Sequence, residues 1–123
     1  MDMKKILVLD DNQDILELIT LLLELEGYQV IGLNNGHGLA ATISQCRPDV
    51  VIMDVMLGDL DGRDLCAGMK GDLLTSAIPI IMISASHDLQ ISLMAKACRP
   101  NDFLAKPFDI GCLIEKVQFQ LAS

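Results

Sequence analysis

The segment that most constrains the fold is Val50-Val51-Ile52-Met53-Asp54, in which four apolar residues run directly into an acid. A continuous apolar run of this length predicts a strand buried on both faces, as in a parallel sheet covered by helices. The turn-rich segment from Gly58 to Gly62 follows shortly after it. Asp54 is therefore expected where the strand ends, at the carboxyl edge at which open α/β sheets bind their ligands.

Other parts of the chain repeat this pattern of strands alternating with helices. The predicted strands cover residues 6–9, 28–33, 50–53, 78–83 and 103–105. Apolar residues at helical spacing predict helices between Asn12 and Gly27 and over residues 39–44, 63–69, 89–97 and 110–121. Strand and helix alternate five times with short connections, which predicts a parallel sheet with right-handed crossovers. Residues 1–123 are therefore interpreted as one α/β domain.

Composition narrows the classes of protein that this chain can represent. With 123 residues, of which 51% are hydrophobic, the chain is long enough for one packed core and too short for two. A formal net charge of -8 argues against direct binding of nucleic acid, which needs clustered Lys and Arg. No apolar stretch approaches the roughly 20 residues of a membrane span, and an acid follows too soon for a signal peptide. A cytoplasmic protein with reduced cysteines is expected; these are Cys46, Cys66, Cys98 and Cys112.

Five polar residues should meet at the carboxyl edge of the predicted sheet, because each follows a predicted strand: Asp10, Asp11, Asp54, Ser84 and Lys106. Three carboxylates brought close together repel, so a raised pKa or a bound cation must offset the repulsion. Oxygen-only ligands with open coordination positions suit Mg²⁺. A lysine and a hydroxyl beside it would complete a pocket for a phosphoryl group, with Asp54 as the nucleophile.

Each of these residues, taken singly, also has an ordinary structural interpretation. Asp10 and Asp11 could serve only as acids at a helix N-terminus, and Asp54 could begin an acidic turn. Ser84 could cap a helix, and Lys106 could be a surface lysine at a strand end. Their convergence favours a functional site, because chance would scatter them over both edges of the sheet.

The sequence resembles the receiver domain of two-component response regulators over essentially its whole length. Four segments carry the resemblance, in this order: Ile6 to Asn12, Val51 to Leu57 with Asp61-Gly62, Ile81 to Ala85, and Asp102 to Phe108. It implies a flavodoxin-like α/β fold with a five-stranded parallel sheet in the order 2-1-3-4-5 and helices on both faces.

The resemblance also implies roles for the acids. Asp54 corresponds to the phosphoacceptor, which takes a phosphoryl group from a phosphohistidine on a sensor histidine kinase or a histidine phosphotransfer protein. Asp11 would bind Mg²⁺ directly, Asp10 would bind it through water, and the Met56 backbone carbonyl would be a further ligand. Such a chain is a signalling domain rather than an enzyme, since it catalyses only its own phosphorylation and dephosphorylation.

The same resemblance implies a switch. Lys106 would pair with the phosphoryl oxygens, while the Ser84 hydroxyl and the Ala85 backbone N–H would hydrogen-bond them. Movement of Ser84 would draw Phe103 inward and change the face built from the fourth helix, the fifth strand and the last helix. That face is also the candidate contact of a homodimer.

Two alternatives remain open at this stage. A phosphatase of the haloacid dehalogenase type would need Asp-x-Asp after the first strand, whereas this chain has Asp10-Asp11-Asn12. A receiver fold kept only for docking or dimerisation is the other alternative. It rests on two departures from the family pattern: Gly58 in place of a loop proline, which should loosen that loop, and Arg99-Pro100 in place of a small pair.

Overall fold

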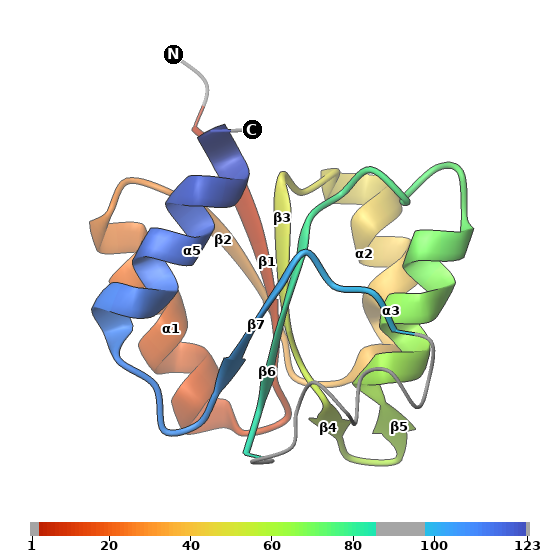
Figure 1. Ribbon diagram of the computed structural model, residues 1–123, viewed down its shortest axis with the longest axis horizontal. Coiled ribbons are helices and arrows are strands. Elements are labelled where there is room, and N and C mark those ends of the chain that lie inside the picture. The colour runs from red at the N-terminus through yellow and green to blue at the C-terminus, as the bar shows by residue number, and fades with distance from the viewer. Residues whose placement is uncertain (1–2, 86–97, 123) are drawn as a thin grey trace.

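The computed structural model describes residues 3–85 and 98–122. Five parallel strands form the central sheet in the order β2-β1-β3-β6-β7 (Figure 1). Their bounds are Lys5–Leu9 for β1, Gln29–Leu33 for β2, Val50–Asp54 for β3, Ile80–Ser84 for β6 and Asp102–Ala105 for β7. The sequence prediction of the order 2-1-3-4-5 is confirmed, because β4 and β5 form a separate two-stranded sheet.

Helices cover both faces of the sheet, as predicted. On one face lie α1 (Gln13–Leu25) and α5 (Ile110–Ala122); on the other lie α2 (Leu39–Cys46), preceded by the 3-10 turn η1 (Gly36–Gly38), and α3 (Gly62–Gly71) (Figure 1). The helix predicted over residues 89–97 lies outside the described residues. No helix in the described part of the chain is long and apolar enough to cross a membrane.

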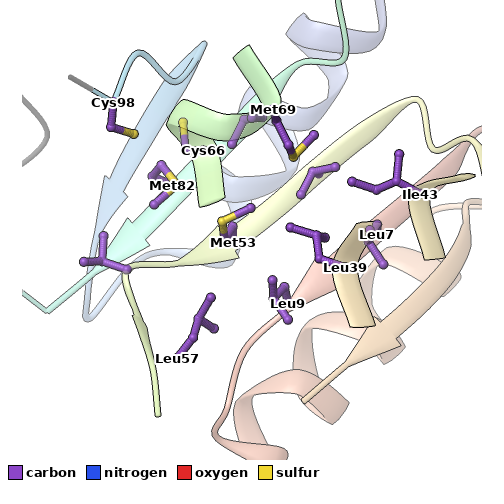
Figure 2. Packing of buried hydrophobic residues seen from close by; sticks show 13 residues of the cluster. Leu7, Leu9, Leu39, Ile43, Met53, Leu57, Cys66, Met69, Met82 and Cys98 are labelled. Carbon is purple, nitrogen blue, oxygen red and sulfur yellow. The ribbon is translucent and has the colours of Figure 1, made fainter. Parts of the chain in front are cut away.

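Two hydrophobic clusters, one on each face of the sheet, form the core. Successive residues of β3 alternate between them: Val51 and Met53 pack in the cluster under α2 and α3, whereas Val50 and Ile52 pack in the cluster under α1 and α5. Figure 2 shows the first of these clusters, with Met53 in it. All of β3 is buried. The continuous apolar run in the sequence therefore does reflect a strand covered on both sides.

Some predicted boundaries were wrong by one or two residues. The strand predicted over 78–83 begins at Ile80, because Pro79 has no backbone N–H for the ladder; its carbonyl instead accepts from Val51 N at 2.9 Å. The short helix predicted over 63–69 runs from Gly62 to Gly71, since the Asp61 side chain caps its first turn and Cys66 and Met69 bury one face.

The segment after Asp54 forms a short hairpin. β4 (Met56–Leu57) pairs antiparallel with β5 (Leu60–Asp61), and Gly58 occupies the turn with φ +67°. The sequence suggested a loosened loop here; the structure has paired backbone. A glycine at this position suits the left-handed conformation that the turn uses.

Candidate functional site

Three carboxylates converge at the carboxyl edge of the sheet. Asp10 and Asp11 follow β1, and Asp54 ends β3, the strand paired beside it. One carboxylate oxygen from each of the three lies within 4.8 Å of the others. Asp10 is 1% exposed and Asp54 6%, whereas Asp11 is exposed to solvent. The predicted acidic cluster therefore forms, with two of its members inside the protein.

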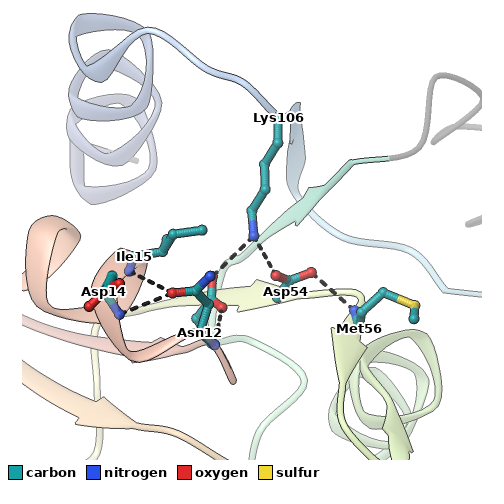
Figure 3. Close-up of polar contacts among 7 residues, drawn as sticks. Asn12, Asp14, Ile15, Asp54, Met56 and Lys106 are labelled. Atoms are coloured by element: carbon teal, nitrogen blue, oxygen red, sulfur yellow. Dashed lines mark hydrogen bonds and ion pairs between the residues drawn. The ribbon is translucent and has the colours of Figure 1, made fainter.

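The connection from β1 into α1 holds Asp10 in place. Its backbone N–H donates to the Leu33 carbonyl at 3.1 Å, and its Oδ1 accepts from Asn12 N at 2.9 Å. The Asn12 side chain in turn accepts from the first-turn amides of Asp14 and Ile15, at 3.0 and 3.2 Å (Figure 3). The Asn12 N-cap of α1 thus fixes the turn that carries both acids.

Asp54 is held by both of its oxygens. Oδ1 accepts from the Met56 backbone N–H at 3.0 Å, and Oδ2 lies 2.6 Å from the Lys106 Nζ (Figure 3). The same ammonium lies 3.3 Å from Asp10 Oδ2. A single cation therefore bridges two buried carboxylates, which offsets part of their repulsion.

The neighbouring strand end positions Lys106. Its backbone N–H donates to the Ser84 carbonyl at 2.7 Å, just beyond the last pair of the β6–β7 ladder, Ser84 with Ala105. Ser84 is buried and Ala85 is exposed. The predicted hydroxyl therefore lies at the end of β6, and the predicted lysine lies just after the end of the neighbouring strand β7.

Burial and charge oppose one another at this site. The pKa of Asp10 is raised, chiefly by burial and further by the Asp54 carboxylate, although the Asn12 N–H and Lys106 act in the other direction. Burial alone would lower the pKa of Lys106, but its hydrogen bond to Asp54 and the charges of both acids outweigh that and raise it. Crowded anions around one ammonium make the site attractive to a further cation.

The structure places two further predicted residues, Met56 and Phe103, but shows no contact that tests their predicted roles. Met56 lies beside Asp54 through its backbone N–H, and its side chain is 69% exposed. Phe103 lies on β7 opposite Met82 and is 40% exposed. Their predicted roles, as carbonyl ligand and switch residue, stay predictions.

Sequence reasoning missed the part played by Gly62. Its N–H donates to the Val55 carbonyl at 2.7 Å, and a Cβ built on it would collide with the Asp54 carbonyl oxygen. Only glycine therefore lets the start of α3 approach the strand that carries Asp54. The signal in the sequence is the glycine after Asp61, which serves above as part of a turn and of the family resemblance but not as a point of close approach.

A separate groove lies away from these residues. A groove of about 930 Å³ runs between α2 and α3, with Ile43 and Leu65 among its lining residues, and it includes none of the acids or Lys106. Groove size alone would point away from the acidic cluster. We identify the functional site by its convergent charges, because a phosphoryl or metal site needs few groups and little volume.

Comparison with known proteins agrees with this site. Residues 6–118 match the response regulator receiver domain family. Protein PilH of Pseudomonas aeruginosa is 32% identical over 120 residues, which is 98% of this chain and 99% of PilH. The DNA-binding dual master transcriptional regulator RpaA of Synechocystis is 32% identical over 116 residues, which is 94% of this chain and 48% of RpaA. The chain thus spans about half the length of RpaA and of the similarly matched DNA-binding regulator MtrA.

Solved structures give the same result. The receiver domain of a signal transduction histidine kinase from Syntrophus aciditrophicus superposes with a TM-score of 0.89 at 30% identity, covering 97% of this chain and 90% of that one. The chemotaxis response regulator CheY4 of Vibrio cholerae has a TM-score of 0.87 at 26% identity, covering 98% of this chain and all of CheY4. The flavodoxin-like fold, the acids gathered around one lysine and these matches together show that the chain belongs to the response regulator receiver domain family.

Proposed function

We propose that Asp54 is the phosphoacceptor of a two-component relay and receives its phosphoryl group from a phosphohistidine. The donor would be a sensor histidine kinase or a histidine phosphotransfer protein. The observation that carries this proposal is the contact of 2.6 Å between Lys106 Nζ and Asp54 Oδ2, within a cluster that also contains Asp10 and Asp11. This arrangement joins a nucleophilic carboxylate to a cation that can bind the incoming oxygens.

The donor set fits Mg²⁺. Carboxylate oxygens from Asp10, Asp11 and Asp54 are hard ligands, and the exposure of Asp11 leaves room for waters or phosphoryl oxygens. We assign the metal to these three acids and the Met56 carbonyl. When bound, the ion would neutralise charge on the transferred phosphoryl group.

The chain's own residues supply orientation and charge. The Met56 N–H and Lys106 hold the two Asp54 oxygens before transfer. As an Asp54 oxygen bonds to phosphorus, the nitrogen–phosphorus bond of the donor breaks. Lys106 then pairs with the phosphoryl oxygens, and the Ser84 hydroxyl and Ala85 N–H bind them.

We further propose that this event is the switch. Ser84 and Lys106 lie at the ends of β6 and β7, and Phe103 lies on β7, so a movement of Ser84 acts directly on that strand. The signalling face would comprise residues 89–97, β7 and α5, and a homodimer would use it. Residues 89–97 lie outside the part of the chain that the structure describes.

The proposal also covers the extent of the domain, its location and its class of activity. Residues 1–123 would form one receiver domain that acts in the cytoplasm as a signalling switch and not as an enzyme on other substrates. RpaA and MtrA are DNA-binding regulators that are about twice as long as the region they share with this chain. Given the net charge of -8, we assign no direct contact with nucleic acid to this domain.

Incubation with Mg²⁺ and acetyl phosphate, followed by intact-mass measurement, tests the proposal. Wild type should acquire a single, transient phosphoryl adduct, and Asp54→Asn should acquire none. An absence of any adduct would favour a docking module. Turnover of many donor molecules that persists in Asp54→Asn and stops in Asp10→Asn would favour the phosphatase.

A further inference from the structure

Two of the four cysteines face one another in the core. Cys66 lies on the inner side of α3 and is fully buried, and Cys98 lies four residues before β7 and is 5% exposed. Both belong to the cluster under α2 and α3, and the Cys98 sulfur is turned toward Cys66 (Figure 2). The two thiols lie close enough for each to shift the pKa of the other. The fold therefore brings together two cysteines that lie 32 positions apart in the sequence, at 66 and 98.

The surroundings make the two sulfurs unequal. Cys66 receives hydrogen bonds from the Cys98 thiol and the Arg99 backbone N–H and lies near the Lys70 ammonium, and these lower its pKa although burial opposes them. The same hydrogen bond and burial raise the pKa of Cys98. A thiol whose pKa is lowered beside one whose pKa is raised is the arrangement of a nucleophilic and a resolving cysteine.

We propose that Cys66 and Cys98 form a reversible disulfide when the protein meets hydrogen peroxide. The Cys66 thiolate attacks one peroxide oxygen, the O–O bond breaks, and the products are a Cys66 sulfenic acid and hydroxide. The Cys98 sulfur then attacks the Cys66 sulfur and displaces the hydroxyl group, which leaves as water with the proton that Cys98 gives up. Peroxide is reduced and the two thiols are oxidised, with two waters formed in all.

The bond would join two parts of the molecule that flank the acidic site. α3 follows the hairpin after Asp54, and the segment from Cys98 leads into β7, which ends at Lys106. One polar contact already links them, from Lys70 Nζ to the Asn101 side chain at 2.6 Å. A disulfide would make this link covalent and the state of the domain dependent on redox conditions.

The test uses the full chain with Cys46→Ser and Cys112→Ser, which leaves only the proposed pair. Hydrogen peroxide should remove two hydrogen atoms, about 2 Da, and dithiothreitol should restore them. Because the chain has seven methionines that peroxide also oxidises, tryptic mapping under non-reducing conditions provides the decisive readout. Residues 64–70 should be linked to residues 97–116, since trypsin does not cleave before Pro100 or Pro107.

Adding Cys66→Ala or Cys98→Ala to this background supplies the matched controls, with circular dichroism to verify folding. Either change should abolish the linked peptide, so failure of one variant to fold leaves the other as a test. Because Cys66 is fully buried, the reaction should be slower than that of an exposed thiol. The proposal is overturned if the pair stays reduced while methionines gain oxygen, or if both thiols only gain oxygen. Neither readout depends on phosphorylation of Asp54.

Discussion

At the scale of single residues, Lys106 contributes an ammonium group that contacts both buried acids. Asp10 lies 3.3 Å and Asp54 2.6 Å from its Nζ, and its own side chain is 18% exposed. Burying carboxylates is costly unless a counter-charge and hydrogen bonds compensate. The stability of the metal-free protein should therefore depend on this residue.

Lys106→Met keeps most of the apolar stem and removes the charge. In metal-free urea unfolding, the free energy of unfolding should fall by roughly 1–3 kcal/mol, because two buried acids lose their cation. Lys116→Met is the matched control: its partner Asp102 lies at 2.9 Å, but both side chains are 26% exposed, so less than about 1 kcal/mol is expected. Equal losses in the two variants would contradict this account of Lys106.

Gly62 and Gly68 lie in the same helix, α3, and we expect their replacement by alanine to change the free energy of unfolding in opposite directions. At Gly62 a Cβ would meet the backbone of Asp54 and Val55, whereas at Gly68 it would meet nothing within 4 Å. Gly62→Ala should lower the free energy of unfolding by roughly 2–4 kcal/mol and slow phosphorylation of Asp54. Gly68→Ala should raise it by up to about 1 kcal/mol, through helix propensity. Urea unfolding of both variants measures these changes. If the free energy of unfolding changed in the same direction in both, the close approach at Gly62 would be refuted.

At the scale of elements, the acidic edge depends on connections outside it. Lys70, in the last turn of α3, donates to the carbonyl of Ile78 at 3.0 Å and to the side chain of Asn101 at 2.6 Å. Asn101 Oδ1 also accepts from Ile80 N, the first residue of β6. Lys70 thus connects α3 by hydrogen bonds to the starts of β6 and β7. The other ends of these two strands carry Ser84 and Lys106.

Lys70→Met should loosen this connection. Loss of the charged hydrogen bonds should lower the free energy of unfolding near neutral pH by roughly 1–2 kcal/mol. Amide hydrogen exchange should rise at the β6 and β7 amides and stay unchanged in β1 and β2. A uniform rise over all strands would show that Lys70 acts only on global stability.

The difference in free energy of unfolding between wild type and Lys70→Met should also depend on pH. Burial lowers the pKa of Lys70 in the folded state below its ordinary value of 10.5. Between the two pKa values the unfolded chain binds more protons, so stability contributed by this group rises with pH. The free energy of unfolding of wild type relative to Lys70→Met should therefore increase as pH rises toward 10.5 and level off above it. A decrease over that range would mean that the folded protein favours the charged lysine.

At the scale of the whole molecule, a parallel sheet covered by helices on both faces places the carboxyl ends of all its strands along one edge. Here that edge carries the acids, the serine and the lysine, while the interior on either side is apolar. Mg²⁺ that binds only the folded chain should stabilise the domain as a unit.

Addition of Mg²⁺ should raise the free energy of unfolding of wild type, by about 2.7 kcal/mol at a hundredfold excess over Kd, and EDTA should reverse this. Asp11→Asn should lose most of the gain, because it removes an exposed carboxylate of the cluster without disturbing the core. Asp14→Asn, an exposed acid in the first turn of α1 outside the cluster, should respond like wild type. Urea titrations with and without Mg²⁺ measure all three. An undiminished gain in Asp11→Asn would exclude this residue as a ligand.

The sequence pattern by itself determined the alternation of strands and helices, the helices on both faces and the edge at which the acids gather, whereas the order of the strands followed from the resemblance to receiver domains. The reason is local: continuous apolar runs such as 50–53 are stable only as strands covered on both sides, and an acid directly after such a run must emerge at the carboxyl edge. The N-cap at Asn12 was also predictable, since it depends only on the next few amides.

Only the tertiary structure decided which groups touch. Lys106 reaches Asp54 across 52 positions of sequence, and this contact depends on the register of β6 and β7 and on the reach of one side chain. The pairing of Cys66 with Cys98 and the close approach of Gly62 to the Asp54 backbone likewise depend on how α3 lies against the sheet. Periodicity carries no information about such distances, because they are set by the packing of segments that are far apart in the chain.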